Sequence, residues 1–230
     1  MNSIEHFVDG KIFKGNSKKT GKVFNPATGE QTSEVKLGTT TDVNKAVEVA
    51  KKAFLSWSQK TPLFRARVLF KFKELIEKNS DELTKIIVSE HGKVYEDAKG
   101  SLTRGLEVVE FACGIPQLLK GEFTENVGTN VDSWSTRQPL GVCAGITPFN
   151  FPAMVPMWMF PMAIACGNTF VLKPSEKDPS CSMKLAELFI EAGLPPGVFN
   201  VVNGDKEAVD AIINNKDIAA VSFVGSTPIA

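Results

Sequence analysis

Between residues 40 and 114, apolar side chains recur every three or four positions, which is the spacing of one face of a helix. The pattern predicts a helix over residues 43–57, with Thr40 or Thr41 able to cap its start. Pro62 is typical of a first helical turn and predicts the start of a second helix. A further helical stretch is expected to stop at Gly92, and another covers residues 94–114. We therefore expect a helical region in the first half of the chain.

Short strands are predicted on either side of this helical region. Residues 6–13 and 21–24 are strand candidates, and the second is followed by a turn of sequence N-P-A-T-G at residues 25–29. Residues 116–130 look irregular. Residues 131–138 alternate but are polar, which predicts an exposed strand.

From Gly141 onward, buried strands and helices alternate. The predicted strands cover residues 142–146, 169–172, 198–202 and 219–224, and the predicted helices cover residues 154–165, 183–192 and 207–214. This alternation indicates an α/β fold with a doubly wound parallel sheet, a Rossmann-like cofactor domain.

Composition narrows the classes of partner. Lys plus Arg and Asp plus Glu both number 26, so the net charge of zero gives no reason to expect a nucleic acid or an anionic membrane as partner. The most apolar stretch, residues 151–166, is interrupted by prolines and predicts a buried helix. The four cysteines form no C-x-x-C pair, so we expect no metal site. Without a secretory signal at the start, we expect a reduced, cytoplasmic protein.

The segment T-P-F-N-F-P, residues 147–152, follows a predicted buried strand. Ligands of open α/β sheets bind at this carboxyl edge. Asn150 places an amide donor between two phenylalanines, and a donor fixed in an apolar site can stabilise an oxyanion that forms on a carbonyl. The alternative is that Asn150 caps the following helix or satisfies its own turn.

Two further strand ends carry candidate cofactor groups. Lys173 and Glu176 follow the next strand and could bracket a ribose, where the charge of Glu176 would repel a 2′-phosphate and favour NAD over NADP. Gly225 and Ser226 follow the last strand, in a small turn whose backbone N–H groups could reach a phosphate. Each of these strand ends could equally be an ordinary turn. Three successive strand ends that all offer a plausible cofactor group are therefore more informative than any one of them.

Several motifs, in order and at the usual spacing, resemble those of the aldehyde dehydrogenase family. They are N-P-A-T-G-E, P-F-N-F-P, G-N-T-F-V-L-K-P-S-E, G-L-P-P-G-V-F-N-V-V-N-G and F-V-G-S-T, and together they extend over essentially the whole chain. Within the family, the P-F-N-F-P segment, the Met-rich helix after it and R-G-L-E-V-V-E-F-A at residues 104–112 are most similar to the CoA-acylating members that act on methylmalonate semialdehyde.

The resemblance implies roles for the candidate residues. Asn150 would be the oxyanion donor, and the cofactor would be NAD, held by Thr147, Phe149, Lys173, Glu176, Lys177, Gly225 and Ser226. In this assignment Thr147 and Phe149 line the nicotinamide side. Lys173 and Glu176 hold the adenosine ribose with Lys177 beside them, and Ser226 meets the pyrophosphate. Relatives often carry a second glycine where this chain has Ala230, which leaves the phosphate contact there less well supported.

Arg104 is the candidate for substrate binding. In the resembling enzymes an Arg at this place is implicated in binding the substrate carboxylate, which suits the planar bidentate guanidinium. Gly105 would leave room for the substrate. The alternative is a surface Arg paired with Asp97, Glu107 or Glu110.

The implied reaction is NAD-dependent oxidation of methylmalonate or malonate semialdehyde, with coenzyme A as co-substrate, to propionyl-CoA or acetyl-CoA with loss of CO2. None of the four cysteines is expected to be the nucleophile, although Cys181, at a predicted helix start, has a local reason for reactivity. We therefore interpret residues 1–230 as the N-terminal NAD-binding portion of such an enzyme, without its catalytic domain. Alone, the chain is expected to bind NAD poorly and to lack turnover.

Two alternative functions and the oligomeric state remain open at this point. The chain could belong to a CoA-independent dehydrogenase of an uncharged aldehyde, or it could be a non-catalytic nucleotide-binding or assembly module. Residues 121–140 resemble part of the arm that pairs between subunits in this family, and an exposed strand edge favours pairing. A homo-oligomer, either a dimer or a tetramer, is therefore expected for the full protein.

Overall fold

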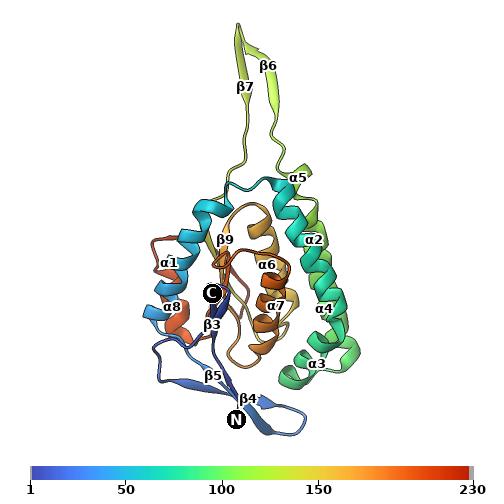
Figure 1. Ribbon diagram of the computed structural model, residues 1–230, viewed down its shortest axis with the longest axis vertical. Coiled ribbons are helices and arrows are strands. Elements are labelled where there is room, and N and C mark those ends of the chain that lie inside the picture. Colours follow the sequence, from blue (N-terminus) through green and yellow to red (C-terminus); the bar gives the residue numbers. More distant parts are fainter. Residues whose placement is uncertain (1, 228–230) are drawn as a thin grey trace.

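The computed structural model describes residues 2–227, and a six-stranded sheet forms its centre (Figure 1). The strands of this sheet are β2 (His6–Val8), β3 (Lys11–Phe13), β8 (Val142–Ile146), β9 (Thr169–Lys173), β10 (Phe199–Val201) and β11 (Ile218–Phe223). Their order is β11-β8-β9-β10-β2-β3, with parallel pairing from β11 to β10. The hairpin β2–β3 continues the sheet in antiparallel fashion, so the strand expected over residues 6–13 is divided by a turn at Asp9 and Gly10.

Helices cover both faces of the sheet, which confirms the predicted doubly wound α/β fold. On one face lie α6 (Met154–Ala165) and α7 (Ser180–Glu191); the other carries α1 (Thr40–Trp57) and α8 (Lys206–Ile213). Successive side chains of β8 point to opposite faces of the sheet, so this one strand contributes to two hydrophobic cores. Cys143 belongs to the core under α6 and α7, whereas Val142, Ala144 and Ile146 belong to the core under α1 and α8.

A second helical layer packs outside α6 and α7. It consists of α2 (Pro62–Lys78), α3 (Ser80–His91), α4 (Tyr95–Cys113) and the short α5 (Ile115–Leu118). Aromatic rings connect this layer to the inner helices, and the inner helices to the sheet. Phe72 of α2 stacks on Phe189 of α7 with ring centroids 4.0 Å apart. Phe160 of α6 meets Phe199 of β10 at 4.4 Å. No helix in the described part of the chain is both long and apolar enough to cross a membrane.

The predicted helix ends are mostly confirmed. Pro62 lies in the first turn of α2, and Gly92 ends α3 in the left-handed conformation with φ 84°. The cap of α1 was predicted one or two residues too late, because Thr39 is the N-cap. Its hydroxyl accepts from the Asp42 N–H, while the Asp42 carboxylate accepts from the Thr39 N–H, which is the reciprocal pair of a capping box.

Two regions contain structure that the pattern did not predict. β5 (Glu30–Lys36) pairs with β4 (Thr20–Asn25) and β1 (Asn2–Ile4) in a separate sheet, although only Val35 of its E-Q-T-S-E-V-K sequence is fully buried. The supposedly irregular stretch 116–130 contributes to α5 and forms β6 (Phe123–Gly128), which pairs with β7 (Val131–Trp134). β7 is therefore shorter than the strand expected over residues 131–138. The β6–β7 hairpin stands away from the body (Figure 1).

Gly105 of α4 lets α4 approach α6 closely. A Cβ at this position would lie 2.4 Å from Cε of Met157 and 3.2 Å from Cα of Met154. We predict that Gly105→Ala lowers the free energy of unfolding by about 1–3 kcal/mol, because Met157 must leave its packed position. Gly100→Ala, in the same helix with open space around it, is the matched control and should stabilise by about 0.4–1 kcal/mol. Denaturant unfolding of both variants measures this, and equal effects would contradict the packing role.

Candidate functional site

A cavity of about 740 Å³ lies at the carboxyl ends of β8, β9 and β11. The chain passes from β8 to β9 on one side and returns to β8 with β11 on the other, so the cavity lies at a topological switch point, where open α/β sheets bind ligands. Its wall includes every residue predicted to hold the cofactor: Thr147, Phe149, Lys173, Glu176, Lys177, Gly225 and Ser226. The start of α8 and the loop before it complete the wall with Asp205, Lys206, Val209 and Asp210.

Lys173 and Glu176 form an ion pair within this wall. Nζ of Lys173 lies 3.5 Å from Oε2 of Glu176, and the side chains are 7% and 38% exposed. Burial lowers the pKa of Lys173, and the charges of Glu176 and Asp205 partly counteract it. The pair therefore presents a carboxylate at the cavity surface above a mostly buried ammonium, a geometry that suits the two hydroxyls of a ribose.

Thr147 and Phe149 form the wall beyond β8. The Thr147 N–H donates to the Lys173 carbonyl at 3.1 Å, which continues the β8–β9 pairing. Its hydroxyl is buried and has no hydrogen-bond partner among the described residues. Phe149 stacks on His91 with ring centroids 4.6 Å apart, and the Lys177 ammonium lies 5.7 Å from its ring centre. The wall thus combines an apolar surface with one buried hydroxyl that has no partner among the described residues.

The Gly225–Ser226 turn lies on the opposite side of the cavity, at the end of β11. The Val224 N–H still donates to the Ile146 carbonyl, so the turn begins immediately after the pairing with β8 ends. A Cβ at Gly225 would lie 2.4 Å from Cζ of Phe223, which gives a packing reason for glycine here. The altered position Ala230 lies outside the described residues.

Asn150 adjoins the cavity without lining it. The residue is exposed, and its side chain makes no hydrogen bond within residues 2–227. Helix α6 begins after Ala153 with no side-chain cap, so capping does not account for Asn150. Its carbonyl accepts from Nζ of Lys93 at 3.0 Å. The amide is therefore available to a ligand while the backbone is held.

Arg104 is exposed on α4 and does not line the cavity. Across the described residues it pairs with no acid, so a surface ion pair with Asp97, Glu107 or Glu110 does not account for it. The expectation that Gly105 leaves room for a substrate is wrong, because Met154 and Met157 of α6 occupy the space beside it.

The cysteine thiols are not activated in this structure. Burial raises the pKa of Cys113 and of Cys143 to about 11 and also raises the pKa of Cys166. Cys181, which has a local reason for reactivity in the sequence, is only 1% exposed. Burial, followed by the charges of Asp178 and Glu90, raises its pKa strongly, so desolvation outweighs the helix terminus.

Sequence reasoning missed a polar cluster beside the Asn150 loop, formed by Glu90, His91, Lys93 and Asp178. Asp178 is 1% exposed, and neither of its oxygens makes a well-formed hydrogen bond, although the Ser175 hydroxyl lies beside it. Burial raises the pKa of Asp178 to about 8, and Glu90 and Glu176 reinforce this. The sequence K-D-P around Asp178 is typical of an exposed turn, so it gave no signal of burial.

Together, the sheet order and the cavity define a doubly wound α/β protein with a candidate ligand site at the ends of its parallel strands. The sequence profile of the aldehyde dehydrogenase family matches residues 12–230. The chain belongs to the aldehyde dehydrogenase family.

Individual relatives are similar along the whole chain. A malonate-semialdehyde dehydrogenase of Pseudomonas aeruginosa is 55% identical over 230 residues, which are 100% of this chain and 46% of the relative. The crystal structure of a methylmalonate-semialdehyde dehydrogenase from Oceanimonas doudoroffii has a TM-score of 0.97 at 57% identity, covering 100% of this chain and 47% of the other. A Sinorhizobium meliloti protein proposed to be of the same kind, complexed with NAD, has a TM-score of 0.98 at 58% identity, with coverage of 100% and 47%. The chain spans about half the length of these relatives.

Proposed function

We propose that this chain is the N-terminal, NAD-holding part of an acylating dehydrogenase of malonate or methylmalonate semialdehyde. The observation that carries the proposal is that all the cofactor residues predicted from separate strand ends line one cavity. Its volume of about 740 Å³ falls within the range of small-molecule sites. The relatives named for these semialdehydes, one of them the acylating mitochondrial enzyme of Arabidopsis thaliana, support the substrate class.

The residues present fit NAD. Glu176 would accept from the ribose 2′-hydroxyl, and Thr147 and Phe149 would line the nicotinamide side. Gly225 and Ser226 would offer backbone N–H groups to the pyrophosphate. When bound, NAD supplies the hydride acceptor for the oxidation.

Asn150 is proposed to stabilise the oxyanion that develops on the aldehyde oxygen. Its side-chain amide is a donor that has no partner among residues 2–227, so no hydrogen bond within that range has to be broken. Coenzyme A would accept the acyl group as co-substrate. The attacking thiolate is not proposed from this chain, since Cys113, Cys143 and Cys181 are buried with raised pKa values. The chain alone is therefore expected to produce no NADH.

Arg104 provides the test of substrate class, since a guanidinium that forms no ion pair in the described part of the chain suits a substrate carboxylate. In the longer enzyme, Arg104→Ala should raise KM for malonate semialdehyde about 30- to 100-fold, because a charge-assisted bidentate contact is lost. The KM for propanal, which has no carboxylate, should change less than about twofold. Arg67→Ala, an exposed arginine of α2, is the matched control.

Steady-state kinetics with NAD and CoA measure these changes in KM. An unchanged KM for the semialdehyde would reject the carboxylate assignment and favour an uncharged aldehyde as substrate. Failure to find any turnover in the longer protein would favour a nucleotide-binding or assembly module.

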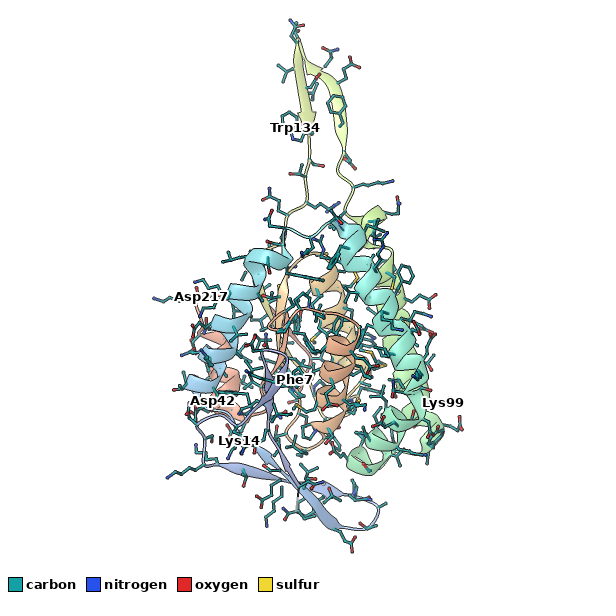
Figure 2. The ribbon with its side chains drawn as sticks, in the orientation of Figure 1. Phe7, Lys14, Asp42, Lys99, Trp134 and Asp217 are labelled. Carbon is teal, nitrogen blue, oxygen red and sulfur yellow. The ribbon has the colours of Figure 1, made fainter. Side chains whose placement is uncertain are left out.

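A homo-oligomer, dimer or tetramer, is proposed as the working form. The β6–β7 hairpin, which carries Trp134, projects from the body (Figure 2). Phe123 and Trp134 are paired across the two strands, and they are 66% and 71% exposed. A second copy would cover this surface. Sedimentation equilibrium tests the assembly, and a monomer at every concentration would exclude it.

Four free thiols support a reducing, cytoplasmic location.

A further inference from the structure

The link between α3 and α4 lies against the loop that carries Asn150. This link, His91, Gly92 and Lys93, is called the clasp below. His91 stacks on Phe149 at 4.6 Å with an interplanar angle of 15°. The Lys93 ammonium donates to the Asn150 carbonyl at 3.0 Å and lies 4.3 Å from the centre of the Phe151 ring. The clasp thus contacts Asn150 and the residues on both sides of it.

The shape of the clasp is fixed by its own surroundings. Gly92 adopts φ 84°, and its N–H donates to the Val88 carbonyl at 3.0 Å, which ends α3. A Cβ on Gly92 would lie 3.0 Å from Cβ and 3.2 Å from Cγ of Pro26, in the N-P-A-T-G turn. Any other residue would be strained in this conformation and crowded by Pro26. The turn and the end of α3 therefore hold the clasp in place.

Lys93 has no competing ion pair within residues 2–227. Burial lowers its pKa, while the charge of Asp97 favours the ammonium. Its only hydrogen bond in that range is the one to the Asn150 carbonyl. An ammonium that donates to a loop carbonyl and also lies over an adjacent aromatic ring restricts rotation of the Asn150–Phe151 peptide.

We propose that Lys93 is a positioning residue that fixes the backbone of Asn150, so that the side chain with its free amide leaves the loop in one direction. The inference deepens the proposed function, on which the role of Asn150 rests. Because the Asn150 side chain has no hydrogen-bond partner within the described residues, the backbone that Lys93 holds is what sets the direction in which this side chain leaves the loop. Lys93 acts through Asn150 and is not itself a catalytic residue.

Backbone and side-chain 15N relaxation of the 230-residue chain tests the proposal. In the unmodified chain the order parameters of Asn150 and Phe151 should be close to those of rigid backbone, about 0.85. In Lys93→Met they should fall below about 0.6, and Lys93→Arg should restore them because arginine keeps both the charge and a donor. Lys99→Met, an exposed lysine of α4, is the matched control and should leave them unchanged.

Three outcomes would overturn the proposal: unchanged order parameters in Lys93→Met, no recovery in Lys93→Arg, or a decrease spread evenly over the whole chain. Thermal unfolding of each variant separates a local effect from a global one. If Lys93→Met does not fold, Lys93→Ala, which also removes both the charge and the donor, provides the same test. The result is independent of NAD binding, so failure of the clasp and failure of the proposed cofactor site are distinguished.

Discussion

Replacing Glu176 by Gln is expected to reduce the preference for NAD over NADP by about 10- to 100-fold. The carboxylate faces the cavity 3.5 Å from Lys173 and would repel a 2′-phosphate placed at the ribose. Removing it leaves the Lys173 ammonium as the nearer charge, and this charge attracts the phosphate. At the half-exposed position of Glu176, the change in interaction energy is roughly 1.5–3 kcal/mol, which corresponds to the stated range.

Titration of NAD and NADP into both proteins measures this ratio. Asp210→Asn is the matched control, since Asp210 lines the same cavity from α8 but forms its own ion pair with Lys206. The ratio should change less than about threefold in this control. An unchanged ratio in Glu176→Gln would contradict the assignment of the ribose to this pair.

Asp178→Asn is expected to stabilise the protein at pH 8 by on the order of 3 kcal/mol. Burial raises the pKa of Asp178 to about 8, and no well-formed hydrogen bond compensates for the loss of water. The amide of Asn has nearly the same shape and no charge to bury. Groups that face Asp178 from neighbouring elements are Glu90 of α3, Lys93 of the clasp and Glu176.

The pH dependence follows from the raised pKa. Between the ordinary aspartate value and about pH 8, the folded state holds a proton that the unfolded state has lost. The free energy of unfolding therefore falls as pH rises through this window, by up to about 1.4 kcal/mol per unit for one group. The advantage of Asp178→Asn should be absent near pH 4 and should grow up to pH 8.

Denaturant unfolding at several pH values measures the effect. Asp217→Asn removes an exposed carboxylate from a surface pair with Lys51 and should change stability by less than about 1 kcal/mol at every pH. Burial also raises the pKa of Glu90, so some slope remains in the Asp178 variant. Equal slopes in the unmodified protein and in Asp178→Asn would contradict a protonated, buried Asp178.

The sequence predicted what depends on local periodicity. Apolar runs located the parallel strands and their helices, and polar residues at strand ends located the cavity wall, because parallel strands end at one edge of a sheet. β5 was missed since its exposed, polar residues do not alternate clearly. Thr39 was missed because Thr39, Thr40 and Thr41 look alike until the reciprocal bond to Asp42 is seen.

The remainder of the site depends on contacts between distant segments. Lys93 and Asn150 are separated by 57 positions, and nothing in the sequence near Lys93 indicates that its ammonium meets that carbonyl. The burial of Asp178 and Cys181 likewise results from the packing of α3 against α7. The local sequence around Asp178 gives no sign of its burial, and the helix start that could activate Cys181 is outweighed by its desolvation.

The most direct test of the proposed cofactor site is an NAD titration of the 15N-labelled chain followed by amide chemical shifts. Weak binding is expected, so NAD concentrations up to several millimolar are appropriate. We expect saturable shifts confined to the cavity wall, at Thr147, Phe149, Lys173, Glu176, Gly225 and Ser226. Absence of shifts at these amides, or saturable shifts centred elsewhere in the chain, would contradict the proposed cofactor site.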